Sequence, residues 1–254
     1  MPVTPGRGET GALRLDVALV ERRLARSRAQ AQDLIKRGLV AVAGSVVRRA
    51  ATPVRASDAI ALAAVAKYVS RGALKLLAAL DHFAFPVAGV VALDIGASTG
   101  GFTQVLIERG ARRVYAVDVG HGQLHPDLKE QSCVVSLEGC DARRLERSIV
   151  PEPVAAIVAD ASFISLGKVL PAALALAQPG AWLVALIKPQ FEAGHAAVGK
   201  GGIVREAAQQ QRAVDLVREW LGGQAGWRVL GVIPAPIRGG SGNQEFLLGA
   251  VNDG

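Results

Sequence analysis

Uninterrupted apolar runs of four to six residues recur through the last 170 residues of the chain, separated by stretches with helical spacing. A strand with one face in water alternates apolar and polar residues, so unbroken runs indicate parallel strands covered by helices on both faces. The sequence therefore predicts an α/β fold with a Rossmann-like, doubly wound sheet of seven strands, the last of them antiparallel. The strands are expected at residues 90–93, 114–117, 134–137, 155–159, 182–187, 229–233 and 246–251, with a helix over 102–109.

The longest uncharged stretch, residues 169–187, is close to the length of a membrane-spanning helix. Pro171 and the turn at residues 178–180 interrupt it, and its second half has the composition of a strand, so we expect no membrane span. Half of all residues are hydrophobic, which is enough for a sizeable core. The N-terminus lacks a signal-peptide pattern, and two cysteines, Cys133 and Cys140, are too few for a disulfide framework. We expect a globular, cytoplasmic protein.

The net charge of +7 is distributed unevenly. Residues 1–75 contain 14 Lys and Arg against 5 Asp and Glu, whereas residues 76–254 contain 15 against 17. A balance of +9 beside one of −2 suggests a module that binds anions, joined to a nearly neutral body. Nucleic acid is the commonest polyanionic partner of a cytoplasmic protein. The alternative is a basic surface that serves only solubility.

The basic part of the chain has the pattern of a compact unit of two helices and a small sheet. Helices are predicted over residues 15–20 and 28–37, with Ser27 as the N-cap of the second and Gly38 directly after it. A hairpin that turns at residues 44–45 and a further strand follow. The predicted division of the chain is a loose tail over residues 1–13, this unit over 14–62, a linker over 63–69 and the α/β domain over 70–254.

The segment from Arg14 to Leu62, which begins RLDVALVERRLARSRAQAQDLIKRGLVAVAG, resembles the αL-type RNA-binding module found in a small-subunit ribosomal protein and in pseudouridine synthases. The resemblance implies that the second helix and its following turn lie against folded RNA. Such contacts go mostly to phosphates and to the shape of the RNA, so the affinity should depend on salt. The RNA-binding residues expected are Arg14, Arg22, Ser27, Arg28, Gln32, Lys36 and Arg37, with Arg71 beyond the module.

A glycine-rich turn, DIGASTGGF over residues 94–102, follows the first strand of the predicted sheet. Its glycines let the backbone approach a ligand at the carboxyl edge, where α/β sheets bind their ligands. The turn lacks the lysine of a phosphate-binding P-loop and the G-x-G-x-x-G spacing of a dinucleotide site. Asp94 instead suits the ammonium or sulfonium end of S-adenosylmethionine. A purely structural strand-to-helix turn is the alternative.

Carboxylates also end the next strands. Asp118 is placed to accept both ribose hydroxyls of an adenosine ligand, and Asp141 could reach the adenine amino group; either could instead be a surface carboxylate. The cofactor-binding residues expected are Asp94, Gly96, Ala97, Ser98, Gly100, Gly101, Phe102, Asp118, Val119, Asp141 and Asp160.

Four further charged residues, Lys75, Asp160, Lys188 and Glu245, fall at or near the same edge of the sheet. Lysines and acids around one cleft shift each other's pKa values, and a partly desolvated lysine can act as a base. The alternative for each of these residues, taken alone, is a solvated charge on the surface with no catalytic role.

Seven blocks between residues 68 and 248 resemble the hemolysin A (TlyA) family of rRNA methyltransferases and the wider FtsJ-like 2′-O-methyltransferases. They read YVSRGALKL, DIGASTGGFTQVL, VDVGHGQLHPDL, DASFISL, LIKPQFE, VGKGGIVR and GNQEFLL. The resemblance implies the class I methyltransferase fold, S-adenosylmethionine as cofactor, no metal, and ribosomal RNA as substrate with a cytidine as the target.

In the wider family a Lys-Asp-Lys-Glu tetrad surrounds the target ribose, and the resemblance maps it to Lys75, Asp160, Lys188 and Glu245. The implied reaction is in-line transfer of the sulfonium methyl group to a ribose 2′-hydroxyl. Lys188 is expected to take or steer the hydroxyl proton while Asp160 holds it. Lys75 and Glu245 are expected to orient the ribose and the first pair, because much of such catalysis is alignment.

Two other functions stay open at this point: a membrane-lytic protein, as the hemolysin name implies, and an RNA-binding ribosome-assembly factor without catalysis. The complete tetrad favours an enzyme over the second of these. His121 and His125 are spaced like a metal-ligand pair but have no third ligand, so no metal site is predicted. The basic loop at residues 199–205 suits RNA entry, or is a plain surface loop.

Overall fold

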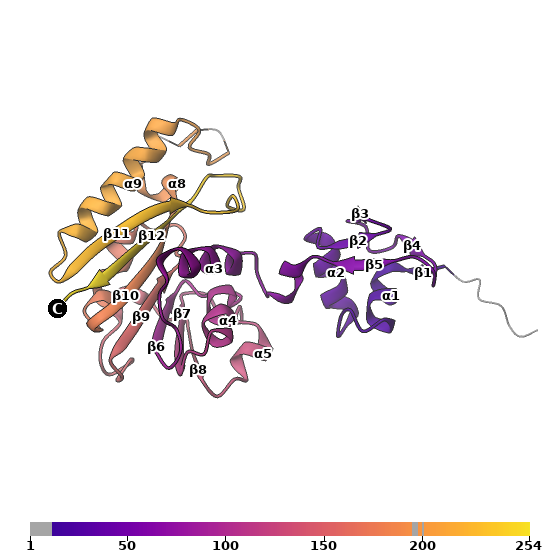
Figure 1. The fold of residues 1–254 in the computed structure, drawn as a ribbon, viewed down its shortest axis with the longest axis horizontal. Coiled ribbons are helices and arrows are strands. Elements are labelled where there is room, and N and C mark those ends of the chain that lie inside the picture. The colour runs from indigo at the N-terminus through magenta and orange to yellow at the C-terminus, as the bar shows by residue number, and fades with distance from the viewer. Residues whose placement is uncertain (1–11, 195–197, 200) are drawn as a thin grey trace, which may run out of the picture. The chain divides into compact units, whose positions relative to one another are not determined.

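The computed structural model describes residues 12–194, 198–199 and 201–254. The chain divides into two compact units, the first ending at Lys67 and the second beginning at Tyr68 (Figure 1). Most of the tail predicted over residues 1–13, and Lys200 of the predicted RNA-entry loop, lie outside the described residues.

The first unit contains the two helices and the hairpin that the sequence predicts. The Ser27 side chain accepts a hydrogen bond of 3.2 Å from the Gln30 N–H, which caps the second helix, and Gly38 follows that helix with a φ of +72°. A second pair of very short strands was not expected. The elements are β1 (Leu13–Arg14), α1 (Leu15–Glu21), α2 (Arg28–Lys36), β2 (Val40–Val42), β3 (Ser45–Val46), β4 (Pro53–Val54), β5 (Ile60–Leu62) and η1 (Ala64–Lys67).

The small sheet of the first unit has the order β3-β2-β5, and β1 pairs separately with β4. Leu15 and Leu19 of α1 and Ile35 of α2 are fully buried, and Val54 of β4 belongs to the same apolar cluster. The unit therefore has a core of its own.

The second unit is built around a seven-stranded sheet of order β11-β12-β10-β9-β6-β7-β8. The last strand, β12, lies between β10 and β11 and runs antiparallel to both, whereas the other strand pairs of the sheet are parallel. This confirms the predicted doubly wound sheet with an antiparallel last strand. The strands are β6 (Val91–Ile95), β7 (Arg113–Asp118), β8 (Val134–Glu138), β9 (Val154–Ala159), β10 (Ala177–Ile187), β11 (Trp227–Pro234) and β12 (Phe246–Asn252).

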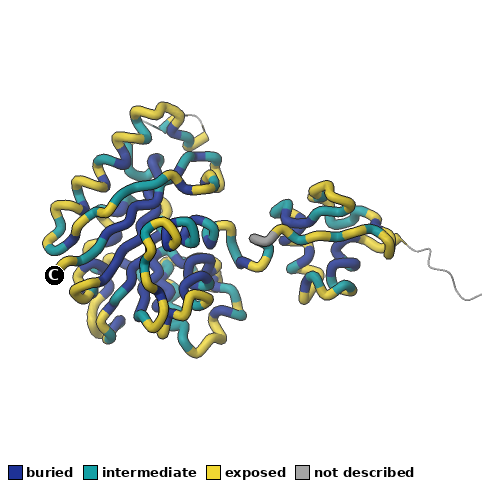
Figure 2. The backbone as a smooth tube through the Cα atoms, in the orientation of Figure 1, coloured by how far each residue is buried: buried dark blue, intermediate teal, exposed yellow. Residues whose placement is uncertain are grey.

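Helices cover both faces of this sheet, and the strands between them form the buried centre of the unit in Figure 2. On one face α9 packs through Val214, Val217 and Leu221 into the cluster that holds Leu93 of β6. On the other face the Phe83 ring of α3 lies against Gly249 of β12. The helical elements are α3 (Gly72–Phe83), α4 (Gly101–Glu108), α5 (Pro126–Lys129), η2 (Ala142–Arg144), α6 (Leu166–Val169), α7 (Pro171–Leu174), α8 (Pro189–Glu192) and α9 (Ala207–Gly222).

The long uncharged stretch is divided between the end of α6, α7 and β10, so it forms no continuous helix. The turn predicted at residues 178–180 was wrong: these residues belong to β10, where the pairing with β9 shifts register between Ala177 and Trp182. Residues 181–187 of β10 are buried in the middle of the sheet. In the part of the chain that the structure describes, none of the helices combines the length and the apolar character that crossing a bilayer requires.

Candidate active site

Two adjoining cavities open at the carboxyl edge of the large sheet. The first has a volume of about 430 Å³ and the second about 490 Å³. Both are lined by Gly96, Ser98, Asp160 and Ser162, so the glycine-rich turn and the end of β9 separate them. A ligand that spans this wall would contact two differently lined chambers at once.

A buried pair of opposite charges lies at the wall of the first cavity. Lys75 of α3 donates a hydrogen bond of 2.5 Å from Nζ to Oε2 of Glu245, the residue before β12. Lys75 lines the cavity, whereas Glu245 lies behind it and is only 3% exposed. Gly239 packs directly on the Glu245 carboxylate, where a Cβ would collide with it. Glu245 thus holds Lys75 and supports the loop that precedes β12.

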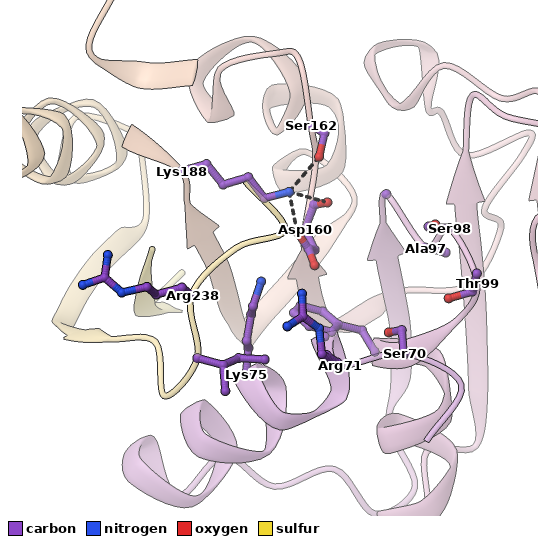
Figure 3. Close-up of a pocket in the computed structure, with 16 residues that line it drawn as sticks. Ser70, Arg71, Lys75, Ala97, Ser98, Thr99, Asp160, Ser162, Lys188 and Arg238 are labelled. Atoms are coloured by element: carbon purple, nitrogen blue, oxygen red, sulfur yellow. Dashed lines mark hydrogen bonds and ion pairs between the residues drawn. The ribbon is translucent and has the colours of Figure 1, made fainter. Parts of the chain in front are cut away.

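A second pair faces the same cavity (Figure 3). The Nζ atom of Lys188, which follows β10, lies 2.6 Å from Oδ1 of Asp160, which follows β9. It also donates to Oγ of Ser162 at 2.8 Å and, more weakly, to the backbone oxygen of Asp160 at 3.4 Å. Because an ammonium group has three hydrogens, these three acceptors fix its position closely.

The glycine-rich turn is shaped by close backbone approaches. Gly96 has a φ of +80°, and a Cβ there would lie 2.9 Å from the backbone oxygen of Asp160, so only glycine fits. The Asp118 carboxylate accepts one hydrogen bond from the Ser98 N–H and one from the Gly120 N–H, both of 2.8 Å. Each carboxylate oxygen keeps a free lone pair for a further donor, and Asp118 lines the second cavity.

Asp94 does not reach either cavity. In the central strand β6 its side chain points to the face covered by α4, where Oδ2 accepts a 2.6 Å hydrogen bond from Thr103 Oγ1. Its Oδ1 is buried without a hydrogen-bond partner among the described residues, and burial raises the pKa of the carboxyl group to about 7. The predicted direct contact of Asp94 with a ligand therefore does not fit its position, because Asp94 is fully buried beneath the turn.

The second cavity holds the other predicted adenosine contacts. Asp141 lies at its edge with Arg143, whose guanidinium bonds both carboxylate oxygens and lowers the pKa of Asp141 to about 2. Of the cofactor-binding residues that the sequence predicts, the first cavity is lined by Gly96, Ala97, Ser98, Gly101, Phe102 and Asp160, the second by Gly96, Ser98, Asp118, Val119, Asp141 and Asp160, and neither by Asp94 or Gly100.

Comparison with known proteins matches residues 68–251 to the FtsJ-like methyltransferase family. The chain belongs to this family. Residues 13–60 match the S4 domain.

The relatives place the chain in the TlyA group of FtsJ-like methyltransferases. It is 47% identical to 16S/23S rRNA (cytidine-2′-O)-methyltransferase TlyA of Mycobacterium tuberculosis, over 92% of this chain and 88% of the relative. It is 38% identical to Hemolysin A of Brachyspira hyodysenteriae, over 92% and 98%. A solved structure of a hemolysin candidate from Streptococcus thermophilus is similar with a TM-score of 0.72 at 36% identity, covering 95% of this chain and 88% of that one.

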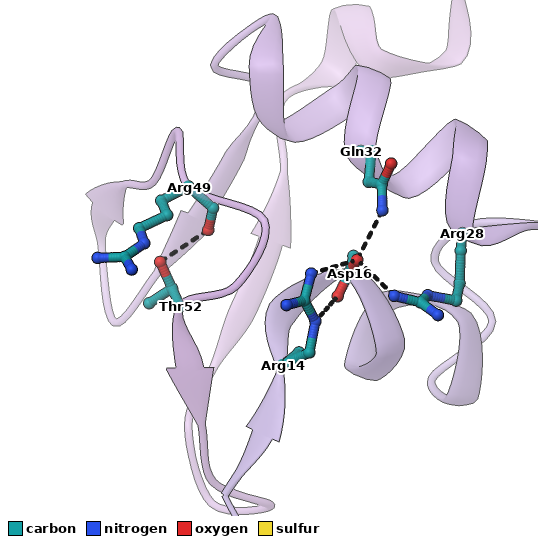
Figure 4. A network of polar contacts seen from close by, with 6 residues as sticks. All are labelled: Arg14, Asp16, Arg28, Gln32, Arg49 and Thr52. Atoms are coloured by element: carbon teal, nitrogen blue, oxygen red, sulfur yellow. Dashed lines mark hydrogen bonds and ion pairs between the residues drawn. The ribbon is translucent and has the colours of Figure 1, made fainter.

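In the S4 domain of this FtsJ-like methyltransferase, one buried carboxylate fixes three of the side chains that are predicted to contact RNA (Figure 4). Asp16 is fully buried at the start of α1 and accepts hydrogen bonds of 2.8–3.2 Å from Arg14, Arg28 and Gln32. The Arg14 guanidinium in particular holds the pKa of Asp16 well below its usual range. Both arginine side chains are still about half exposed, so each can offer its remaining donors to an anion.

The other residues that are predicted to contact RNA differ in whether their side chains already have partners within the protein. Arg22 uses its guanidinium inside the domain, on the backbone oxygens of Arg55, Ala56 and Asp58. Arg37 pairs with Asp33 at 3.1 Å. Of the remaining three residues, Ser27 caps α2, Lys36 is exposed on α2, and Arg71 lines the first cavity of the methyltransferase domain.

Of the lining residues that were not predicted, three have side chains suited to binding RNA or to holding Lys188. Ser162 and Phe163 follow Asp160 within the DASF block, of which only the aspartate was assigned a role. Phe163 is 91% exposed at the rim of the second cavity and packs against Phe191 with ring centroids 5.2 Å apart. Arg238 lies in the loop between β11 and β12, and no local pattern indicated that this loop lines the cavity.

Proposed function

We propose that this protein transfers the methyl group of S-adenosylmethionine to a ribose 2′-hydroxyl of ribosomal RNA. The observation that carries the proposal is that the lysines of two lysine–carboxylate pairs line one cavity, with a second cavity, lined by Asp118 and Asp141, across the glycine-rich turn. The name of the mycobacterial relative supports a cytidine as the target nucleotide. A ribosomal RNA substrate would place the enzyme in the cytoplasm.

The second cavity has the donor set for the adenosine part of the cofactor. Asp118 keeps acceptor capacity for two ribose hydroxyls, and Asp141 and Cys140 line the wall beyond it. The methionine part would pass between the cavities along Gly96 and Ser98, which line both of them. Bound there, the cofactor supplies an activated methyl group on a sulfonium.

The first cavity has the groups to hold the target ribose. Lys75, fixed by Glu245, orients the sugar from the α3 side. Lys188, held by Asp160 and Ser162, contacts the 2′-hydroxyl. As an ammonium it steers the hydroxyl, and to take the hydroxyl proton it must first lose one of its own protons to solvent, which frees its lone pair. Since the methyl group is already activated, most of the rate gain comes from holding the reacting oxygen in line. Phe163 follows Ser162 in the chain and is exposed at the rim of the second cavity, where it offers an aromatic face on which a base can stack.

The test is methyl transfer from radiolabelled S-adenosylmethionine to purified ribosomal subunits, followed by mapping of ribose methylation. Lys188→Ala should retain cofactor binding by calorimetry and lose transfer. Lys188→Arg keeps a positive charge beside Asp160 but cannot release a proton, so it should also be inactive if Lys188 takes the proton. Transfer by Lys188→Ala at nearly the wild-type rate would refute the assignment. Failure of the wild-type chain to bind the cofactor would favour an RNA-binding factor without catalysis.

A further inference from the structure

The loop at residues 235–245, between β11 and β12, folds back over the first cavity. It is closed by backbone hydrogen bonds from the Gly239 N–H to the Asn243 oxygen, 3.0 Å, and from the Gly242 N–H to the Gly239 oxygen, 2.9 Å. In Figure 3 the loop carries Arg238 on the side of the cavity away from the glycine-rich turn, with Lys75 and Arg71 between them. Arg238 therefore lies at the rim of the cavity that is proposed to hold the ribose, and its guanidinium points outward from Lys75 and Arg71 in this view.

Asn243 anchors this loop to a second one. Its side chain is 1% exposed, and both of its polar atoms are used. Oδ1 accepts a 2.9 Å hydrogen bond from the Val204 N–H, and Nδ2 donates one of 2.8 Å to the Gly202 oxygen. Together with the packing of Gly239 on Glu245, this bond pair fixes the path of the backbone that carries Arg238.

The charges around the cavity are not balanced. Lys75 and Lys188 each have a carboxylate partner. Arg71 and Arg238 also line the cavity, but neither forms an ion pair within the described part of the chain. Arg238 donates to the Gly242 oxygen at 3.1 Å and keeps the rest of its guanidinium donors free. A nucleotide in RNA has one phosphodiester group on each side of its ribose. Two guanidinium groups without carboxylate partners beside the ribose site could each bind one of these phosphates.

We propose that Arg238 binds an RNA backbone phosphate next to the methylated nucleotide, on the other side of the ribose site from Arg71, and that Asn243 is the positioning residue for this contact. The proposal rests on the proposed function, since it assumes an RNA substrate in the first cavity. It adds a phosphate-binding site within the methyltransferase domain itself, separate from the S4 domain.

The first test compares Arg238→Ala and Arg238→Lys in the full-length protein. Binding to purified ribosomal subunits is measured over a range of KCl concentrations, cofactor binding by calorimetry, and KM and kcat by transfer of the radiolabelled methyl group. For Arg238→Ala we expect KM for the subunits to rise about tenfold with a smaller effect on kcat, and the slope of log affinity against log salt to fall by about one. Arg238→Lys should restore the slope but only part of the affinity, because it lacks the bidentate fork.

The matched control is Arg218→Ala, which removes an exposed arginine of α9 away from the cavity and should leave KM and the salt slope as in the wild type. A wild-type KM and slope in Arg238→Ala would overturn the proposal. So would weakened cofactor binding in that variant, which would assign Arg238 to the cofactor. Because the salt slope is a binding measurement, it tests Arg238 even if the wild-type chain transfers no methyl group, and that result would refute only the proposed function.

The second test is a double-mutant cycle. Asn243→Ala should weaken RNA binding in the wild-type background and have little further effect in Arg238→Ala, because the loop then has no guanidinium left to place. Equal effects in both backgrounds would overturn the positioning role. Cofactor affinity and thermal unfolding of each variant establish that it is folded.

Discussion

The Nζ atom of Lys75 lies 2.5 Å from Oε2 of Glu245, although the two residues are 170 positions apart in the chain. The contact joins the first helix of the methyltransferase domain to its last strand, and both side chains are less than 10% exposed. An ion pair in this position serves two purposes, since it holds a lysine at the ribose site and closes the domain at its carboxyl edge.

Removing one partner of this pair should therefore be costly. Lys75→Met leaves the Glu245 carboxylate buried without its counter-ion, and we expect a loss of unfolding free energy of about 3–5 kcal/mol. The double variant Lys75→Met with Glu245→Gln should recover most of that stability but no methyl transfer. Denaturant unfolding and transfer assays measure the two effects. If the double variant were as active as the wild type, the pair would have only a structural role.

A second prediction concerns the buried carboxyl group of Asp94. Its pKa is raised from 3.8 to about 7 in the folded protein, so the folded state binds more protons than the unfolded state between these values. Stability should consequently fall as the pH rises from about 4 to about 7. Asp94→Asn removes this cost and should be more stable than the wild type at pH 8, by up to about 4 kcal/mol at 1.36 kcal/mol per pKa unit.

The comparison is made by urea unfolding of both proteins across this pH range. The advantage of Asp94→Asn should shrink as the pH approaches 4; an advantage that does not change with pH would contradict the raised pKa. Asp94→Ala should in addition weaken cofactor binding, because it removes the support that Thr103 and Asp94 give the glycine-rich turn from below.

The main features of the fold could be predicted because a strand buried on both faces leaves an unbroken apolar run. The ends of those runs also placed Asp160, Lys188 and Asp118 at one edge of the sheet. The two-residue strands β1 and β4 were missed because so few residues show no periodicity.

The parts of the site that the sequence did not predict depend on contacts between distant segments. The direction of the Asp94 side chain follows from the register of β6 between β7 and β9, where it pairs with Ala116 and Val158. The approach of Arg238 to the cavity depends on Asn243, whose partners lie about 40 residues earlier in the chain. The spacing of residues along the sequence predicts neither the direction of the Asp94 side chain nor the position of Arg238.

A third prediction follows from the 2.8 Å hydrogen bond between Lys188 and Ser162. Ser162→Ala removes one of the three acceptors around the Lys188 ammonium and should lower kcat by about ten- to a hundredfold, since reacting groups must be held close to their productive geometry. KM for the ribosomal subunits should change little. Ser162→Thr keeps the hydroxyl and should restore most of the rate; a rate as low as that of Ser162→Ala would argue that packing, not the hydrogen bond, matters at this position.

The last prediction concerns Asp16 in the S4 domain. Because Asp16 fixes Arg14 and Arg28 in a half-exposed arrangement, Asp16→Ala in the full-length protein should weaken binding to ribosomal subunits even though it adds a net positive charge. Glu21→Gln makes the same change in charge at an exposed position of α1 and should leave binding unchanged or slightly tighter. Cofactor affinity, which belongs to the other unit, should stay the same in both variants. If Asp16→Ala bound the subunits as tightly as Glu21→Gln, the arrangement of these arginines would not contribute to RNA recognition.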